Sequence, residues 1–414
     1  MFVTRVTNKI RADGPPLRVI IITINVFQEK VNLNNMFLRH MKGWRAACEV
    51  CGREAADVSA TLRVCAACVR DRFEDARPYI ESAHARIRKS YGLPAKAPKD
   101  PKGVWCGGCG NDCRIPAGGK GFCGVVENIG GKLIRRFGTP ERGLLSWYYD
   151  PLPTNCVPAD FCAGSSGAGY PKWCRTPRGD IGWNNLSIFM GSCTYSCLFC
   201  QNYGFRELTA SGKPTMTAAQ LAEKAEDGVG CTCYFGGDPT SQMPFVIKSA
   251  ELMRKAAAKE KRLLRVCLET NLSMNLPSLK QFGKLSMESG GGIKADLKCW
   301  SSEILYALSG IEHRMAYENF KWLGKRHSKR PEVPFARVST LLVPGYINDQ
   351  EIRSIASFIA DLDPTIPYSL LAFHPLYYME DMPYTRREDA ERFVEICKKE
   401  GLQRVRVGNP WLLC

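Results

Sequence analysis

Short apolar runs alternate with amphipathic segments from about residue 184 to about residue 410. The segments between the runs space their apolar residues as helices do, for example at 244–261, and Thr217 is placed to cap a helix at 217–228. This alternation predicts an α/β fold with a parallel sheet, either open or closed into a barrel. Residues with chemical roles are then expected at the C-terminal ends of the strands. The apolar runs fall at 185–190, 231–235, 263–270, 292–298, 336–343, 368–374 and 403–408.

The residues before this region lack the alternation and divide by composition instead. An apolar run at 19–27 is too short to span a bilayer, and no small-residue cleavage site follows it. The segment 93–103 is rich in proline and lysine, as linkers often are. The predicted organisation is a leader at 1–40 that is mobile or an over-extended start, a zinc-ribbon-like module at 41–92, a linker at 93–103, a second cysteine-rich module with an irregular connection at 104–183, and a core at 184–414.

Cysteine content and charge narrow the classes of protein. The 414 residues include 20 cysteines, many of them in Cys-x2-Cys pairs, which favours metal binding over a secreted disulfide framework. Thiols stay reduced in the cytoplasm, so this is the expected location. The formal net charge of +16 has three explanations: solvated helix faces, an acidic protein partner, or a surface that binds RNA.

The most specific motif is Cys-x3-Cys-x2-Cys at Cys193, Cys197 and Cys200, in a loop after the first predicted strand of the core. Three thiolates on a [4Fe–4S] cluster leave one iron without a protein ligand. A structural zinc ion prefers a fourth ligand close by, and the residues that follow, Gln201 and Asn202, are poor zinc ligands. The spacing therefore indicates a cluster whose open iron is completed by a substrate or a cofactor.

This loop resembles the signature of the radical S-adenosylmethionine (SAM) superfamily, including the aromatic Phe199 just before the third cysteine. The resemblance implies a partial (β/α)6-type parallel barrel with small metal-binding modules at its N-terminus. It also implies that the methionine amine and carboxylate of SAM chelate the open iron. One electron from the cluster then cleaves SAM to a 5′-deoxyadenosyl radical, and Cys193, Cys197 and Cys200 are the catalytic ligands.

Further strand ends resemble the pyruvate formate-lyase activating enzyme branch of this superfamily. YFGGDPT at 234–240 is similar to its Gly-Gly-Glu-Pro segment, with aspartate in place of glutamate, which implies contact with the methionine amine. LETN at 268–271 and KADLK at 294–298 resemble segments that serve the cofactor carboxylate or an adjacent cation, and an ion pair across the barrel mouth is the structural alternative. AFHP at 372–375 also matches. The implied cofactor-binding residues are Phe199, Gly236, Gly237, Asp238, Glu269, Asp296, Lys298 and His374.

Two further cysteine groups precede the core. Cys48, Cys51, Cys65 and Cys68 form Cys-x2-Cys-x13-Cys-x2-Cys, which is typical of a zinc ribbon. Such a ribbon usually recognises a macromolecule, although structural support is the simpler role. The second group is similar to the N-terminal region of the AmmeMemoRadiSam-system radical proteins and can hold either zinc or an auxiliary [4Fe–4S] cluster. It consists of Cys106, Cys109, Cys113 and Cys123, any of which could be replaced as a ligand by Cys156, Cys162 or Cys174.

The resemblance implies an enzyme that abstracts hydrogen from a macromolecular substrate, most like a glycyl-radical activating enzyme acting on a protein. The alternatives are a radical enzyme that modifies RNA and a zinc-dependent binding protein whose barrel has lost its chemistry. The expected cofactors are a [4Fe–4S] cluster, SAM and zinc, with the auxiliary cluster as the open addition. An electron donor such as ferredoxin or flavodoxin is expected, and no membrane partner.

Overall fold

The computed structural model describes residues 45–154, 156–312 and 314–414. The predicted leader at 1–40 lies outside these residues. Within the described part, no helix combines the length and the apolar character that a bilayer crossing requires.

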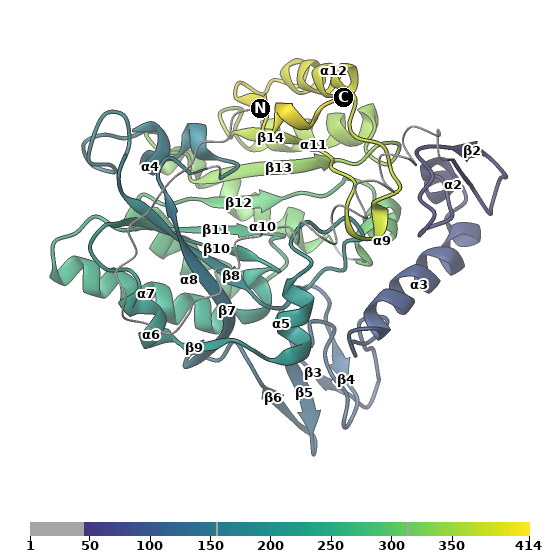
Figure 1. Cartoon of the computed structure of the whole chain (residues 1–414), viewed down its shortest axis with the longest axis horizontal. Coiled ribbons are helices and arrows are strands. Elements are labelled where there is room, and N and C mark those ends of the chain that lie inside the picture. Colours follow the sequence, from purple (N-terminus) through teal and green to yellow (C-terminus); the bar gives the residue numbers. More distant parts are fainter. Residues whose placement is uncertain (1–44, 155, 313) are drawn as a thin grey trace, which may run out of the picture. The chain divides into compact units, whose positions relative to one another are not determined.

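The core is a nine-stranded sheet with the order β15-β14-β13-β12-β11-β10-β8-β7-β9 (Figure 1). From β8 to β15 every neighbouring pair is parallel and follows the order of the chain. Among the described residues β15 pairs only with β14, so the sheet remains open, and the predicted partial parallel barrel is confirmed. These strands are β8 (Asn184–Met190), β10 (Val229–Gly236), β11 (Arg265–Thr270), β12 (Ile293–Asp296), β13 (Ala336–Leu342), β14 (Tyr368–Ala372) and β15 (Val405–Val407).

Helices follow most of these strands, as the alternating pattern predicts. Thr217 caps α6 through a capping box in which its hydroxyl accepts from the Gln220 N–H, and the Gln220 side chain accepts from the Thr217 N–H. On α11 the apolar residues recur at helical spacing, and Ile352, Ile355 and Ile359 are fully buried. The helices are α5 (Phe205–Ser211), α6 (Ala218–Glu223), α7 (Met243–Lys259), α8 (Leu276–Ser289), α9 (Ser302–Ser309), α10 (Met315–Gly324), α11 (Asp349–Leu362) and α12 (Arg387–Lys399).

The region predicted as the second cysteine-rich module contributes a strand to the core sheet. β7 (Arg142–Pro151) pairs antiparallel with the whole of β8 on one side and with β9 (Thr215–Thr217) on the other. The connection that follows includes a short helix, α4 (Ala163–Ser166). It is held to the sheet by Asp180, whose buried carboxylate accepts from Arg265 of β11 at 2.6 Å.

The N-terminal modules pack against the barrel half. Ribbon residues Leu62 and Val64 belong to the same buried apolar cluster as Tyr346, which follows β13. The Tyr346 hydroxyl donates to the Val64 carbonyl at 2.8 Å, and the Ala60 N–H donates to the Asp381 carboxylate at 2.6 Å. The elements of these modules are β1 (Ala46–Ala47), β2 (Glu54–Ala55), α2 (Ala66–Asp71), α3 (Phe73–Lys89), β3 (Val104–Trp105), β4 (Arg114–Ile115), β5 (Val126–Ile129) and β6 (Lys132–Arg135).

Candidate functional site

A cavity of about 220 Å³ lies at the C-terminal ends of the parallel strands. Residues from the ends of β8, β10, β11, β12 and β13 meet there, because parallel strands end at the same edge of a sheet. The cavity thus brings together nearly all residues that the sequence placed at strand ends. Those that line it are Cys193, Cys197, Phe199, Cys200, Gly236, Gly237, Asp238, Glu269, Asp296 and Lys298.

The cysteine loop is fixed by hydrogen bonds to the C-terminal end of α9. The Ser196 and Leu198 N–H groups donate to carbonyls at the end of α9 at 2.9 and 3.0 Å, and the Cys197 Sγ lies 3.1 Å from the Ser309 hydroxyl. Burial raises the pKa of the Cys193 and Cys200 thiols. These thiols therefore need a cationic partner in the cavity to become thiolates, and iron provides one. Three partly buried cysteines around one cavity fit the predicted cluster.

The glycine pair after β10 passes close to the cysteine loop. A Cβ atom on Gly237 would lie 2.1 Å from the Ser192 carbonyl oxygen, so only glycine fits there. The Gly237 N–H donates to the Met190 carbonyl at 2.9 Å, and the Asp238 N–H donates to the Ser192 carbonyl at 2.8 Å. These two bonds join the end of β10 to the cysteine loop.

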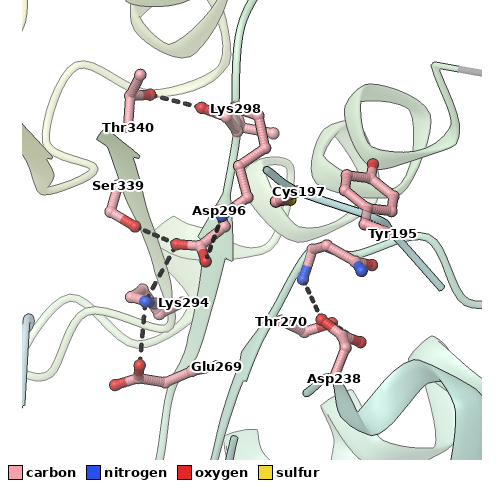
Figure 2. A network of polar contacts seen from close by, with 12 residues as sticks. Tyr195, Cys197, Asp238, Glu269, Thr270, Lys294, Asp296, Lys298, Ser339 and Thr340 are labelled. Carbon is pink, nitrogen blue, oxygen red and sulfur yellow. Dashed lines mark hydrogen bonds and ion pairs between the residues drawn. The ribbon is translucent and has the colours of Figure 1, made fainter. Parts of the chain in front are cut away.

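Asp238 is buried and accepts several hydrogen bonds from its own chain. The N–H groups of Thr240 and Asn271 donate to its carboxylate at 2.8 and 2.6 Å. The Thr270 hydroxyl donates at 3.0 Å, and Figure 2 shows Thr270 beside Asp238. Burial raises the pKa of Asp238 despite these donors. The carboxylate thereby ties the loop after β10 to the loop after β11, and this limits how many of its oxygens can reach a ligand.

An ion-pair chain crosses the other side of the cavity. Figure 2 shows Lys294 between Glu269 and Asp296, at 3.0 and 3.1 Å, and Lys298 reaches the same Asp296 at 3.1 Å. The Ser339 hydroxyl also donates to Asp296. The ion pair that the sequence left as an alternative is therefore present. Lys294 was not among the predicted residues, although Lys294, Asp296 and Lys298 follow the period of two that puts strand residues on one face.

Each charged group in this chain of ion pairs stabilises the ionised form of its neighbours. Burial alone raises the pKa of Asp296, but Lys294 and Lys298 together hold it well below its ordinary value. For Lys294, burial lowers the pKa, and Asp296 and Glu269 raise it by more. Both side chains are consequently charged at neutral pH. The array has two cations and two anions, so a bound carboxylate or ammonium group meets a charged but balanced wall.

His374 and Cys156 depart from the expectations in different ways. The described residues that line the cavity do not include His374, whose Nε2 lies 3.5 Å from the Tyr384 hydroxyl, so its contact with the cofactor stays a prediction. Cys156, by contrast, reaches the site and donates from Sγ to the Glu269 carboxylate at 2.9 Å. Burial, and then the nearby Glu269 charge, raise the pKa of this thiol and keep it protonated.

The two N-terminal cysteine groups differ in how tightly they gather. The ligand atoms of Cys48, Cys51, Cys65 and Cys68 all lie within 4.8 Å of one another, and the sulfurs of Cys51 and Cys65 are 3.8 Å apart. A tetrahedral zinc ion with Zn–S bonds of about 2.3 Å separates its sulfurs by about 3.8 Å, so this group fits zinc. Among the described residues, no other set of possible metal ligands lies as close together. The cysteines from Cys106 to Cys123 are therefore more widely spaced than this first group.

The other three cysteines that could have joined the second group have different partners. Cys156 lies against Glu269, and Cys162 caps α4 by accepting from the Ser165 N–H at 3.3 Å. Cys174 donates to the Thr176 carbonyl at 3.4 Å. The group from Cys106 to Cys123 instead packs beside the cysteine loop, since the Asn111 side chain donates to the Thr194 carbonyl at 2.7 Å.

Comparison with known proteins identifies the class. Residues 187–359 match the model of the radical SAM superfamily, and this range contains the cysteine loop and most of the cavity. This match identifies a radical SAM domain at residues 187–359, in agreement with the superfamily that the sequence predicted. Its sequence is 24% identical over 320 residues to the uncharacterized protein MJ0808 of Methanocaldococcus jannaschii, which covers 75% of this chain and 82% of that protein.

Three solved structures are also similar. Streptococcus suis SuiB aligns with a TM-score of 0.37 and 14% identity over 53% of this chain and 47% of SuiB. SuiB bound to its precursor peptide SuiA gives a TM-score of 0.38 and 16% identity over 51% of this chain and 46% of SuiB. A domain of a pyruvate-formate lyase-activating enzyme from Bacteroides vulgatus aligns with a TM-score of 0.33 and 18% identity. This alignment covers 42% of this chain and 96% of that domain. The chain spans about half the length of the SuiB structures that it matches.

Proposed function

We propose that this radical SAM enzyme abstracts a hydrogen atom from a protein substrate, in the manner of a glycyl-radical activating enzyme. The observation that carries the proposal is the position of the zinc-ribbon-like module. It contacts Tyr346 after β13 and Asp381 after β14, on the side of the sheet where the strands end and the cavity opens. A module of a kind that commonly recognises macromolecules therefore packs on loops that follow these strands.

Different residues of the cavity would bind the cluster and the different groups of SAM. Cys193, Cys197 and Cys200 hold the [4Fe–4S] cluster, which with bound SAM supplies one-electron cleavage chemistry. Gly236 and Gly237 line the cavity, and we assign their carbonyls as acceptors for the methionine amine. Asp238 acts chiefly by fixing these carbonyls, because its carboxylate is already occupied by donors of its own chain.

The chain of ion pairs from Glu269 to Lys298 would bind the carboxylate of SAM. Lys298 is 17% exposed and has one carboxylate partner, whereas Lys294 is 7% exposed and bridges two. Lys298 is therefore the better donor to an incoming carboxylate. Glu269 and Asp296 hold the two lysines in place and keep the wall neutral overall.

Metal content follows from the two N-terminal groups. We assign zinc to the tight group from Cys48 to Cys68. We assign an auxiliary [4Fe–4S] cluster to Cys106, Cys109, Cys113 and Cys123, because four irons separate their thiolates more widely than one zinc ion does. Oxygen-sensitive clusters and reduced thiols suit the cytoplasm, where ferredoxin or flavodoxin can supply the electron.

The test measures 5′-deoxyadenosine release under anaerobic conditions. The reduced, reconstituted full chain with SAM is expected to release it slowly alone and faster with the protein fraction of a cell extract, leaving a glycyl radical detectable by electron paramagnetic resonance. The variant with Cys193, Cys197 and Cys200 all changed to alanine is the control and should release none. Acceleration by the RNA fraction instead would favour the RNA-modifying alternative. Full turnover with small metabolites alone contradicts a macromolecular substrate.

A further inference from the structure

A fully buried arginine lies directly behind the cysteine loop. Arg206 is in the first turn of α5, six residues after Cys200, and is 1% exposed. One guanidinium nitrogen donates to the Ser196 hydroxyl at 3.1 Å, whereas Nε and Nη1 have no hydrogen-bond partner among the described residues. Burying a cation in this way is costly unless an anion compensates its charge.

The described surroundings of Arg206 supply no carboxylate. Its guanidinium lies 5.5 Å from the Tyr91 ring, 5.0 Å from the Phe205 ring and 5.8 Å from the Tyr377 ring. The nearest comparison is Arg265, which is equally buried but pairs with Asp180 at 2.6 Å. Arg206 differs because the described chain offers it no such partner.

The electrostatic neighbours of Arg206 show where an anion is needed. Burial, and then the charge of Arg206, lower the pKa of the buried Arg88 to about 9, so two cations repel each other here. Arg206 donates to Ser196, which lies in the loop between the cavity-lining Cys193 and Cys197. The cysteine side of the cavity is therefore the place where Arg206 would stabilise negative charge.

We propose that Arg206 is the counter-charge of the iron–sulfur cluster held by Cys193, Cys197 and Cys200, and that it raises the reduction potential of this cluster. The inference rests on the cluster assignment. A cluster bound by three thiolates is anionic, and it gains a further negative charge when it accepts one electron from the donor. No bond forms or breaks in this step. A fixed buried cation stabilises the more negative, reduced form.

The test is a redox titration of the reconstituted full chain followed by electron paramagnetic resonance. The cluster at this site is identified by the change in its signal on adding SAM. Arg206→Met is expected to lower the midpoint potential, and Arg206→Lys to keep it near wild type. A tenfold fall in the ratio of reduced to oxidised cluster at a given potential equals 59 mV for one electron.

Two controls separate charge from packing. Ser196→Ala removes the hydrogen bond to Arg206 but leaves the charge, so the potential should not move. Arg330→Lys alters another buried arginine, which donates to the Val333 carbonyl at 3.0 Å just before β13, at the opposite end of the strands from the cavity. It should also leave the potential unchanged.

Each outcome decides the matter. An Arg206→Met protein with wild-type iron content and an unchanged potential overturns the proposal. If Arg206→Met takes up no iron while Arg206→Lys does, the charge is needed and the proposal stands. Equal loss of iron in both variants means that Arg206 acts by packing, and the proposal is wrong. If the wild type holds no more iron than the variant lacking Cys193, Cys197 and Cys200, the cluster assignment itself fails.

Discussion

Lys294 is the cation on which the charged wall of the cavity depends, and Lys294→Met tests this directly. The side chain is 7% exposed and lies 3.0 Å from the Glu269 carboxylate and 3.1 Å from the Asp296 carboxylate. At an effective dielectric constant of about 20, each contact has a gross Coulomb energy of about 5 kcal/mol, most of which the desolvation of the buried charges cancels. Removing one partner of such a buried pair typically destabilises by about 3–5 kcal/mol, because the other charge is left uncompensated.

Glu269 should account for most of this loss. Asp296 keeps Lys298 and Ser339 as partners in the variant, whereas among the described residues the remaining polar contact of Glu269 is the thiol of Cys156. The double variant Lys294→Met, Glu269→Gln should therefore recover a large part of the lost stability. Urea denaturation at pH 7 measures the free energy of unfolding.

The pH dependence of the free energy of unfolding provides a second, independent test of the Lys294 ion pairs. In the wild type the lowered pKa of Asp296 adds stability above its unfolded value of about 4, and this is lost as the pH falls through the folded value. The raised pKa of Lys294 adds stability that is complete below about 10.4 and is lost as the pH rises through the folded value. In Lys294→Met the Asp296 carboxylate loses one of the two lysines that lower its pKa, so less stability is lost on acidification and this variant should approach wild-type stability toward acid pH.

An exposed lysine provides the control for this experiment. Lys321 pairs with Glu318 at 3.0 Å one helical turn away, and the two side chains are 48% and 66% exposed. Lys321→Met should change the free energy of unfolding by less than about 1 kcal/mol. The reasoning is refuted if Lys294→Met is no more destabilising than this control, or if the Glu269→Gln change fails to restore stability in the double variant.

Three further predictions concern other parts of the fold. Thr217→Ala removes the capping box of α6 and should lower the free energy of unfolding by about 1 kcal/mol in urea denaturation, with no change in iron content. Gly237→Ala places a methyl group against the Ser192 carbonyl and should abolish the spectral response of the cluster to SAM; a normal response would contradict the close approach. Chelating zinc from the full chain should lower its Tm, because the ribbon's Val64 carbonyl accepts from buried Tyr346 of the barrel half; an unchanged Tm with zinc fully removed would show that this contact stabilises nothing.

The sequence could predict which residues meet at one edge of the sheet because parallel strands impose a simple geometry. Cys193, Gly237 and Glu269 are separated by about 30 to 45 residues each, yet each follows a recognisable apolar run, so a common sheet edge was predictable. The thiol spacing then indicated the metal chemistry without any three-dimensional information. Local sequence patterns were enough to place a residue at the sheet edge where that residue directly follows a recognisable strand.

Features that depend on distant pairings were not predictable in this way. The contact between Cys156 and Glu269 joins residues 113 positions apart, and the segment that carries Cys156 has neither helical nor strand periodicity. The inward direction of Asp238 depends on donors from Thr270 and Asn271 on the next loop. Likewise the pairing of β7 with the core sheet crosses an irregular connection, which hides it from any local pattern.

The long-range contacts of the ribbon also set an order of events during synthesis. Val64 leaves the ribosome 282 residues before Tyr346, and Ala60 leaves it 321 residues before Asp381. At roughly 5–20 residues per second, the ribbon waits on the order of 15 to 60 s for the surface that will cover it. Throughout this interval the zinc ion that we assign to this module would have to keep its small apolar face folded. A cell short of zinc should therefore lose this enzyme to aggregation of nascent chains, before any question of its catalytic competence arises.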